Sequence, residues 1–178
     1  MSKPDEFTNA LIAHLPSLRR YAVALVGNAA LADDLVQDCI ERALRQSAQL
    51  RELQNMPGWL RRILHNRFID EIRRSRGRGA HQDIADCCDH PDLTVQALDS
   101  LSNRDFVRAM NALSFEHREI LLLVGLEELS YRSIADELGI PIGTVMSRLA
   151  RARERLRSLM QDGEAEIHPV PPALKEAG

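Results

Sequence analysis

The chain has 178 residues, 44% of them hydrophobic and 28% charged, which is the composition of a globular protein with one ordinary domain or two small ones. Only 4% are aromatic, so the core must consist mainly of aliphatic side chains, which favours helices over a β-sandwich. No apolar run approaches the roughly 20 residues that span a bilayer, the N-terminus lacks the apolar core of a secretory signal, and three cysteines make no disulfide framework. We therefore expect a cytoplasmic protein.

The first part of the chain predicts amphipathic helices. Apolar side chains recur at steps of three and four from Phe7 to Leu25, and Pro16 is a candidate break because it removes a helical donor. Gly27 and Asn28 end this helix. A second helix follows over residues 30–46. Its buried stripe is predicted to consist of Leu35, Val36, Cys39, Ile40, Ala43 and Leu44.

A third helix is expected after a loop that contains Asn55 and Pro57, because proline suits the first turn of a helix. It is apolar on most sides. At 100° per residue, its one polar strip consists of Arg62, Asn66, Asp70 and Arg73. Residues 61–78 hold seven arginines and two acids, so this region is locally basic.

The polar strip of the third helix has the chemistry of a nucleic-acid contact. The Asn66 amide can pair with a base edge, and phosphates can be held by Arg62, Arg73 and Arg74. Two alternatives stay open. The arginines can form a solvated helix end, favoured by the helix dipole, and Asn66 can hold the preceding loop in place.

Composition changes after Arg76. Residues 77–100 contain two glycines, one proline, five aspartates and one arginine, and they predict an acidic, partly disordered linker. Four potential metal ligands lie within it: His81, Cys87, Cys88 and His90. Adjacent cysteines do not match a CxxC zinc arrangement, so we expect no metal site and no cofactor, with a metal sensor as a minor alternative. The sequence has no nucleotide-binding loop, catalytic triad or HExxH motif, which argues against an enzyme.

Helical periodicity resumes near Leu101 and continues to Met160, before a tail with three prolines. An apolar helix is followed by a short one, which Ser130 can cap and Gly139 can end. The last helix then begins. Its core stripe is predicted to be Val145, Leu149, Ala152, Leu156 and Leu159. A short helix, a turn with glycine and a longer helix form a helix-turn-helix, whose second helix can enter the DNA major groove.

The last helix concentrates positive charge, although the whole chain has a formal net charge of −3. Five arginines and one acid occupy residues 148–157. One flank of the helix carries the candidate DNA contacts Thr144, Ser147, Arg148, Arg151 and Arg155. Arg153 and Arg157 fall on the other flank. A solvated basic surface is the alternative, and the preceding helix and turn favour DNA binding.

Three stretches resemble the extracytoplasmic-function (ECF) sigma factors, which are minimal members of the bacterial sigma-70 family. ADDLVQDCIERAL is similar to the family's core-polymerase-binding helix, and PGWLRRILHNRFIDEIRRSR is similar to its helix for the −10 promoter element. LSFEHREILLLVGLEELSYRSIADELGIPIGTVMSRLARARERL is similar to its −35-binding domain. The three occur in the family's order and cover most of residues 8–160.

The resemblance implies an all-α protein with two small helical domains. Sigma domain two would span residues 1–76, an acidic flexible linker 77–100, sigma domain four 101–160, and a flexible tail 161–178. It also implies binding to core RNA polymerase and promoter DNA, and control by an anti-sigma factor, without membrane insertion of this chain. The acidic linker would follow the RNA path of the polymerase.

The resemblance also implies roles for individual residues. Core polymerase would contact the exposed side of the second helix at Asp34, Gln37, Asp38 and Arg42. A base of the −10 element would be captured by the loop at 47–57, which contains Asn55, and by Asn66. The alternative for the acids is that they complement the N-terminal dipole of their helix.

Two departures from the family leave promoter preference open. Ser133 stands where relatives often carry glutamate, and Asp70 and Glu71 put acids beside the −10 strip. The rival interpretation is a helix-turn-helix repressor or activator that dimerises through its first domain and binds duplex DNA without polymerase.

Overall fold

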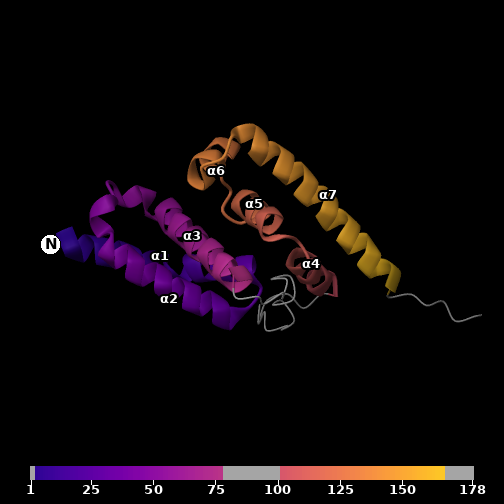
Figure 1. Ribbon diagram of the computed structural model, residues 1–178, viewed down its shortest axis with the longest axis horizontal. Helices are drawn as coiled ribbons and strands as arrows, with labels where there is room; N and C mark the ends of the chain where they lie inside the picture. The colour runs from indigo at the N-terminus through magenta and orange to yellow at the C-terminus, as the bar shows by residue number, and fades with distance from the viewer. Residues whose placement is uncertain (1–2, 78–100, 167–178) are drawn as a thin grey trace, which may run out of the picture.

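The computed structural model describes residues 3–77 and 101–166, and these ranges contain helices and turns but no strand (Figure 1). The first half consists of α1 (Lys3–Val26), α2 (Ala29–Arg45), the short 3₁₀ turns η1 (Ser47–Gln49) and η2 (Leu53–Asn55), and α3 (Met56–Gly77). The second half consists of α4 (Leu101–Asn111), α5 (Phe115–Gly125), α6 (Tyr131–Leu138) and α7 (Ile142–Glu166). The all-α fold is therefore confirmed.

Pro16 does not break the first helix, because α1 runs unbroken through it. The helix buries Leu11 before the proline and Leu18, Tyr21 and Leu25 after it. Burial of these side chains on one continuous face offsets the roughly 3 kcal/mol that an internal proline costs a helix. Asn28 then begins α2, since its Oδ1 accepts a hydrogen bond from the Leu31 amide at 3.0 Å.

The predicted core stripe of α2 is correct except at its end. Leu35, Val36, Cys39 and Ala43 are buried, and Ile40 is half-buried. Leu44, however, is 49% exposed. One step of 100° from the fully buried Ala43 turns the Leu44 side chain toward solvent.

The helix-turn-helix has the predicted caps and core. The Ser130 hydroxyl accepts a hydrogen bond from the Ser133 amide at 3.1 Å, and Gly139 ends α6 in the left-handed conformation with φ +66°. Val145, Leu149 and Ala152 are buried, whereas Leu156 and Leu159 are half-buried. The last helix extends to Glu166, past the expected end at Met160, and no proline interrupts the chain between its first residue and Pro169.

The two halves pack together and share one apolar core (Figure 1). Phe68 of α3 packs on Phe115 of α5 with ring centroids 4.8 Å apart. Buried Arg118 of α5 donates to the Met110 carbonyl in its own half and to the Leu25 carbonyl in α1, each at 2.8 Å. Of the helices in the described ranges, none is long and apolar enough to cross a membrane.

Gly27 is predicted to be required where the halves meet. Its φ is +75°, and a Cβ there would lie 2.7 Å from Asn111 Oδ1 of the second half. Gly27→Ala should therefore lower the free energy of unfolding by about 1–3 kcal/mol. Gly125→Ala is the matched control, because a Cβ at that position meets no atom within 4 Å. Urea unfolding checks both variants, and equal stabilities would contradict the close approach.

Candidate nucleic-acid and polymerase interfaces

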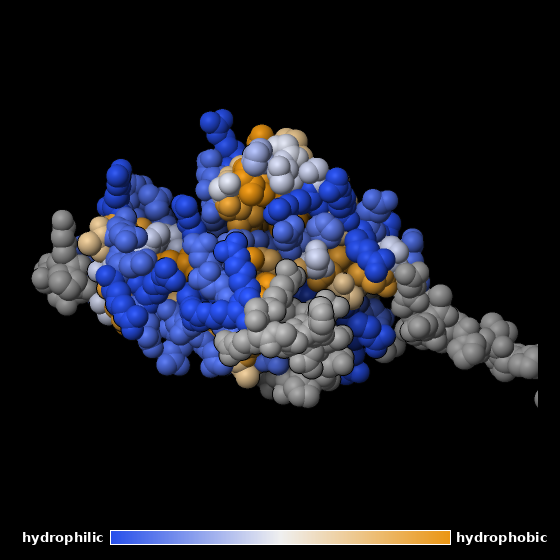
Figure 2. All heavy atoms as spheres, viewed as in Figure 1, coloured by the Kyte–Doolittle hydropathy of each residue, from blue (hydrophilic) through white to orange (hydrophobic). Residues whose placement is uncertain are grey.

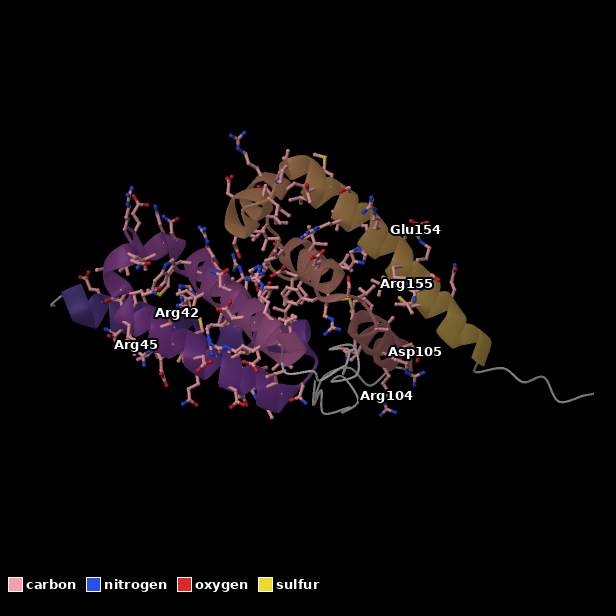
Figure 3. All side chains as sticks on the ribbon, in the orientation of Figure 1. Arg42, Arg45, Arg104, Asp105, Glu154 and Arg155 are labelled. Atoms are coloured by element: carbon pink, nitrogen blue, oxygen red, sulfur yellow. The ribbon has the colours of Figure 1, made fainter. Side chains whose placement is uncertain are left out.

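The predicted DNA face of α7 is largely accessible. Arg151 and Arg155 are exposed, and Figure 3 shows Arg155 on α7, on the other side of the molecule from Arg42 of α2. Ser147 is also exposed, and its hydroxyl donates to the Thr144 carbonyl at 3.1 Å. Thr144 itself is half-buried.

Arg148 has a partner that the sequence analysis did not foresee. Its Nη2 lies 3.3 Å from Glu116 Oε2 of α5, and its side chain is only 28% exposed. The Glu116 carboxylate remains well exposed. An ion pair of this kind is worth about 0–1 kcal/mol, so it orients Arg148 without preventing it from binding DNA.

The start of α7 exposes apolar side chains beside the basic face. Ile142 is 45% and Met146 is 50% exposed, and Tyr131 of α6 is partly exposed nearby. Figure 2 shows orange surface over the α6–α7 region at the top of the molecule. The only sequence signal for the exposure of Ile142 and Met146 is that neither residue lies on the predicted core stripe of the helix.

The polar strip of α3 points to solvent as predicted. Arg62, Asn66 and Arg73 are exposed, and Asp70 is half-buried. The Asn66 amide makes no hydrogen bond within the described residues, so nothing in them supports a role in holding the preceding loop.

The remaining −10 candidates are exposed too. The Asn55 amide donates to Glu52 Oε2 at 3.3 Å, within its own loop. Arg74 lies 3.7 Å from Glu71, a weak surface pair one helical turn away.

The candidate polymerase surface on α2 is divided. Asp34, Gln37 and Arg42 are exposed and belong to one side of the helix. Asp38, in contrast, accepts hydrogen bonds from Nε and Nη2 of Arg67 in α3. This carboxylate therefore ties α2 to α3, and its side chain remains 43% exposed. Leu44 lies about two helical turns after Gln37 and adds an exposed apolar side chain to the same side of α2.

The metal-ligand candidates of the sequence analysis, His81, Cys87, Cys88 and His90, lie outside the described residues. Among the residues that the structure does describe, no group of three or more His, Cys, Asp or Glu could hold a metal ion. Cys39 is a buried core residue, and its burial raises the pKa of the thiol to about 12.

A buried polar cluster between the halves is the feature that sequence analysis missed. Arg61 of α3 donates from Nε and Nη2 to both oxygens of Glu137 in α6, at 2.8 and 2.9 Å. Its Nη1 donates to Glu127, in the turn after α5, at 2.6 Å. The Arg61 side chain is only 9% exposed. The one sequence signal is that Arg61 lies outside the polar strip, on the apolar side of α3, where a charge requires a partner.

A second pair extends this cluster. His65 Nδ1 lies 2.6 Å from Glu119 Oε1, and the Glu119 side chain is 2% exposed. Burial raises the pKa of Glu119, although His65 acts in the opposite direction. Burial works against the charge of Arg61, but its hydrogen bond to Glu137 and the nearby acids raise the Arg61 pKa above the ordinary value. The cluster therefore carries charge between the two halves.

Family comparisons match both halves. Residues 11–65 match the family model of the sigma2 domain of PhyR, and residues 103–156 match that of sigma-70 region 4. The chain is 34% identical to the ECF RNA polymerase sigma factor EcfG of Rhodopseudomonas palustris (strain TIE-1), over 95% of this chain and 93% of that protein. It is 34% identical to the ECF RNA polymerase sigma factor SigE of Mycolicibacterium smegmatis, over 86% of this chain and 61% of that protein.

A solved structure is similar as well. The sigma factor RpoE from Bartonella quintana, crystallised in complex with the anti-sigma factor NepR, matches with a TM-score of 0.70 and 34% identity, over 88% of this chain and 97% of that one. Because a relative matches over nearly its full length and both family regions occur in order, the chain belongs to the ECF sigma factors of the sigma-70 family.

Proposed function

We propose that this chain binds core RNA polymerase and directs it to promoters through a −10 contact on α3 and a −35 contact on α7. The observation that carries the proposal is that each half exposes one face suited to nucleic acid. One is the polar strip around Asn66, and the other is the basic flank around Arg151. Such a protein works in the cytoplasm, where polymerase and chromosome are.

The −35 contact uses the helix-turn-helix. Arg148, Arg151 and Arg155 recur along one flank of α7, at spacings that let them follow the major groove and the adjacent phosphates. Thr144 and Ser147 lie near the start of the helix, where short side chains let the backbone approach DNA. Exposed Ile142 and Met146 offer apolar contact to thymine methyl groups.

The −10 contact uses the end of the loop and the exposed strip of α3. Asn66 can both donate and accept hydrogen bonds, which suits the edge of an extruded base. Arg62, Arg73 and Arg74 supply positive charge for the neighbouring phosphates, and Asn55 borders the loop that would receive the base. Extruding a base costs a few kcal/mol of stacking, which these contacts would offset.

Core polymerase is proposed to contact α2 through Asp34, Gln37, Asp38 and Arg42, with Leu44 as an exposed apolar side chain on the same side of the helix as Gln37. The chain is further proposed to be controlled by an anti-sigma factor. Support comes from the similar sigma factor RpoE, which was crystallised with the anti-sigma factor NepR.

Arg151 is predicted to read or hold −35 DNA. Arg151→Ala should weaken binding of a −35 duplex by about 1–3 kcal/mol if the guanidinium makes a bidentate base contact. Arg157→Ala is the matched control, because Arg157 is also exposed but lies on the other flank of α7. Fluorescence anisotropy with a promoter library measures both. Equal losses from the two variants would remove the assignment of this flank.

Asp34 is predicted to contact core polymerase. Asp34→Lys should weaken the complex with core enzyme by about tenfold, with a smaller difference at high salt, because the reversed charge would face basic residues of the polymerase. Glu6→Lys makes the same charge change on exposed α1 and should have little effect. Unchanged retention of the Asp34 variant on immobilised core enzyme would place the interface elsewhere.

Asn66 is predicted to act in promoter opening. Asn66→Ala should reduce run-off transcription from duplex promoters more than closed-complex binding, because the −35 contact still anchors the DNA. A template with unpaired −10 bases separates two roles of Asn66, which are strand opening and reading of the captured base. If Asn66 only helps strand opening, premelting restores activity. If Asn66 reads the captured base, premelting restores little activity and discrimination at that base relaxes. Full activity of the variant on duplex promoters would exclude both roles.

A further inference from the structure

Arg148 is the one arginine on the basic flank of α7 that has an ion-pair partner within the described residues. Its Nη2 lies 3.3 Å from Oε2 of Glu116, which belongs to the first turn of α5, and its side chain is 28% exposed. Arg151 and Arg155 are exposed and make no ion pair within the same ranges. Arg148 therefore meets DNA with its guanidinium already oriented by a neighbouring helix.

A second acid of α5 also acts on Arg148. Burial raises the pKa of Glu119, and the charges of His65 and Arg148 act in the opposite direction. Glu119 lies three residues after Glu116, so the two acids share one face of α5. Glu119 is buried, whereas the Glu116 side chain is 60% exposed. Glu116 is therefore the acid of this pair that can influence how Arg148 meets DNA.

The ion pair leaves most of the Arg148 guanidinium available. A guanidinium carries several N–H donors in a fixed fork, and Glu116 lies against only one of its nitrogens. Within the described residues, the other nitrogens of Arg148 take part in no hydrogen bond or ion pair. Two free donors are enough for the bidentate contact with O6 and N7 of guanine.

A guanine edge suits this guanidinium better than a phosphate does. A phosphate bound there would place a second full negative charge beside the Glu116 carboxylate, and the two like charges would repel each other. Guanine O6 and N7 are uncharged acceptors and avoid most of this repulsion. The ion pair also restricts the long Arg148 side chain before binding, so that less side-chain entropy is lost when the base is read.

We propose that Glu116 is a specificity-determining residue of the −35 contact, whose carboxylate holds Arg148 for a bidentate contact with one guanine and disfavours its use as a general phosphate contact. Glu116 acts through Arg148, so it is a positioning residue and itself needs no contact with DNA. The inference rests on the proposed function, since it requires this flank of α7 to bind the −35 element. It names the base that Arg148 reads and places part of the choice outside the helix-turn-helix, on α5.

Base discrimination by the assembled protein tests the proposal. The full chain is combined with core polymerase, and binding is measured to a promoter that the wild type selects and to versions substituted at each −35 base pair. With Glu116→Gln, the preference for guanine should fall about two- to fivefold at one position, as expected for the loss of an exposed ion pair. The preferences at the other −35 positions should stay as they are in the wild type.

Arg148→Ala supplies the background that shows whether Glu116 acts through Arg148. This variant should lose the guanine preference at the same position. Adding Glu116→Gln to it should change that preference no further, because the carboxylate has no guanidinium left to position. Glu128→Gln is the matched control, since it removes the charge of an exposed acid that makes no ion pair within the described residues, and it should keep the wild-type preference.

A purely structural role of Glu116 gives a different readout. A carboxylate in the first turn of α5 also complements the helix dipole, and that role affects thermal stability. Thermal unfolding followed by circular dichroism measures it in the wild-type and Arg148→Ala backgrounds. The dipole role alone does not change the preference at a single base pair, so unchanged guanine preference in the Glu116→Gln variant would overturn the proposal.

Two other results would also overturn it. Equal tightening on every sequence by Glu116→Gln would show that the carboxylate only repels DNA. Equal weakening on every sequence would show that Arg148 holds a phosphate and reads no base. Failure of the proposed function itself is distinguishable, because the wild-type chain with core polymerase would then show no base preference at any −35 position.

Discussion

The arrangement of this protein depends on one buried guanidinium, that of Arg61, which Glu137 and Glu127 hold between the two halves. Removing one partner of such a cluster costs about 3–5 kcal/mol, because the remaining charge is stranded. Moving the halves apart instead returns every charged group to water. A charged contact is therefore stable while closed and, unlike a purely apolar one, retains favourable solvation when it opens.

The closed arrangement leaves the two proposed DNA faces uncovered but holds them close together. The strip of α3 and the basic flank of α7 are both exposed while the halves are packed together. The packed form cannot place the two faces as far apart as the −10 and −35 elements. The distance between those elements exceeds the length of any single helix in the described ranges.

Local signals in the sequence predicted much of the fold, including the core stripe of α7, the cap at Ser130 and the left-handed end at Gly139. These features depend on residues three or four positions apart. The contacts that the sequence analysis missed have another origin. Arg67 lies 29 positions from Asp38, and Arg61 lies 76 from Glu137. Periodicity identifies the face on which a side chain lies, but it cannot identify a partner that distant in sequence. For the candidate site, it therefore predicted exposed strips well and missed the buried cluster.

A distance between the halves tests this account most directly. Spin labels at Glu41 of α2 and Arg153 of α7, both exposed, report it by pulsed dipolar spectroscopy in the free chain and in the complex with core polymerase and promoter DNA. The account predicts one short distance in the free chain and a distance greater by tens of ångströms in the complex, as expected for elements about 25 base pairs apart. A free chain already as extended as the complex, or a complex that keeps the short distance, would contradict it.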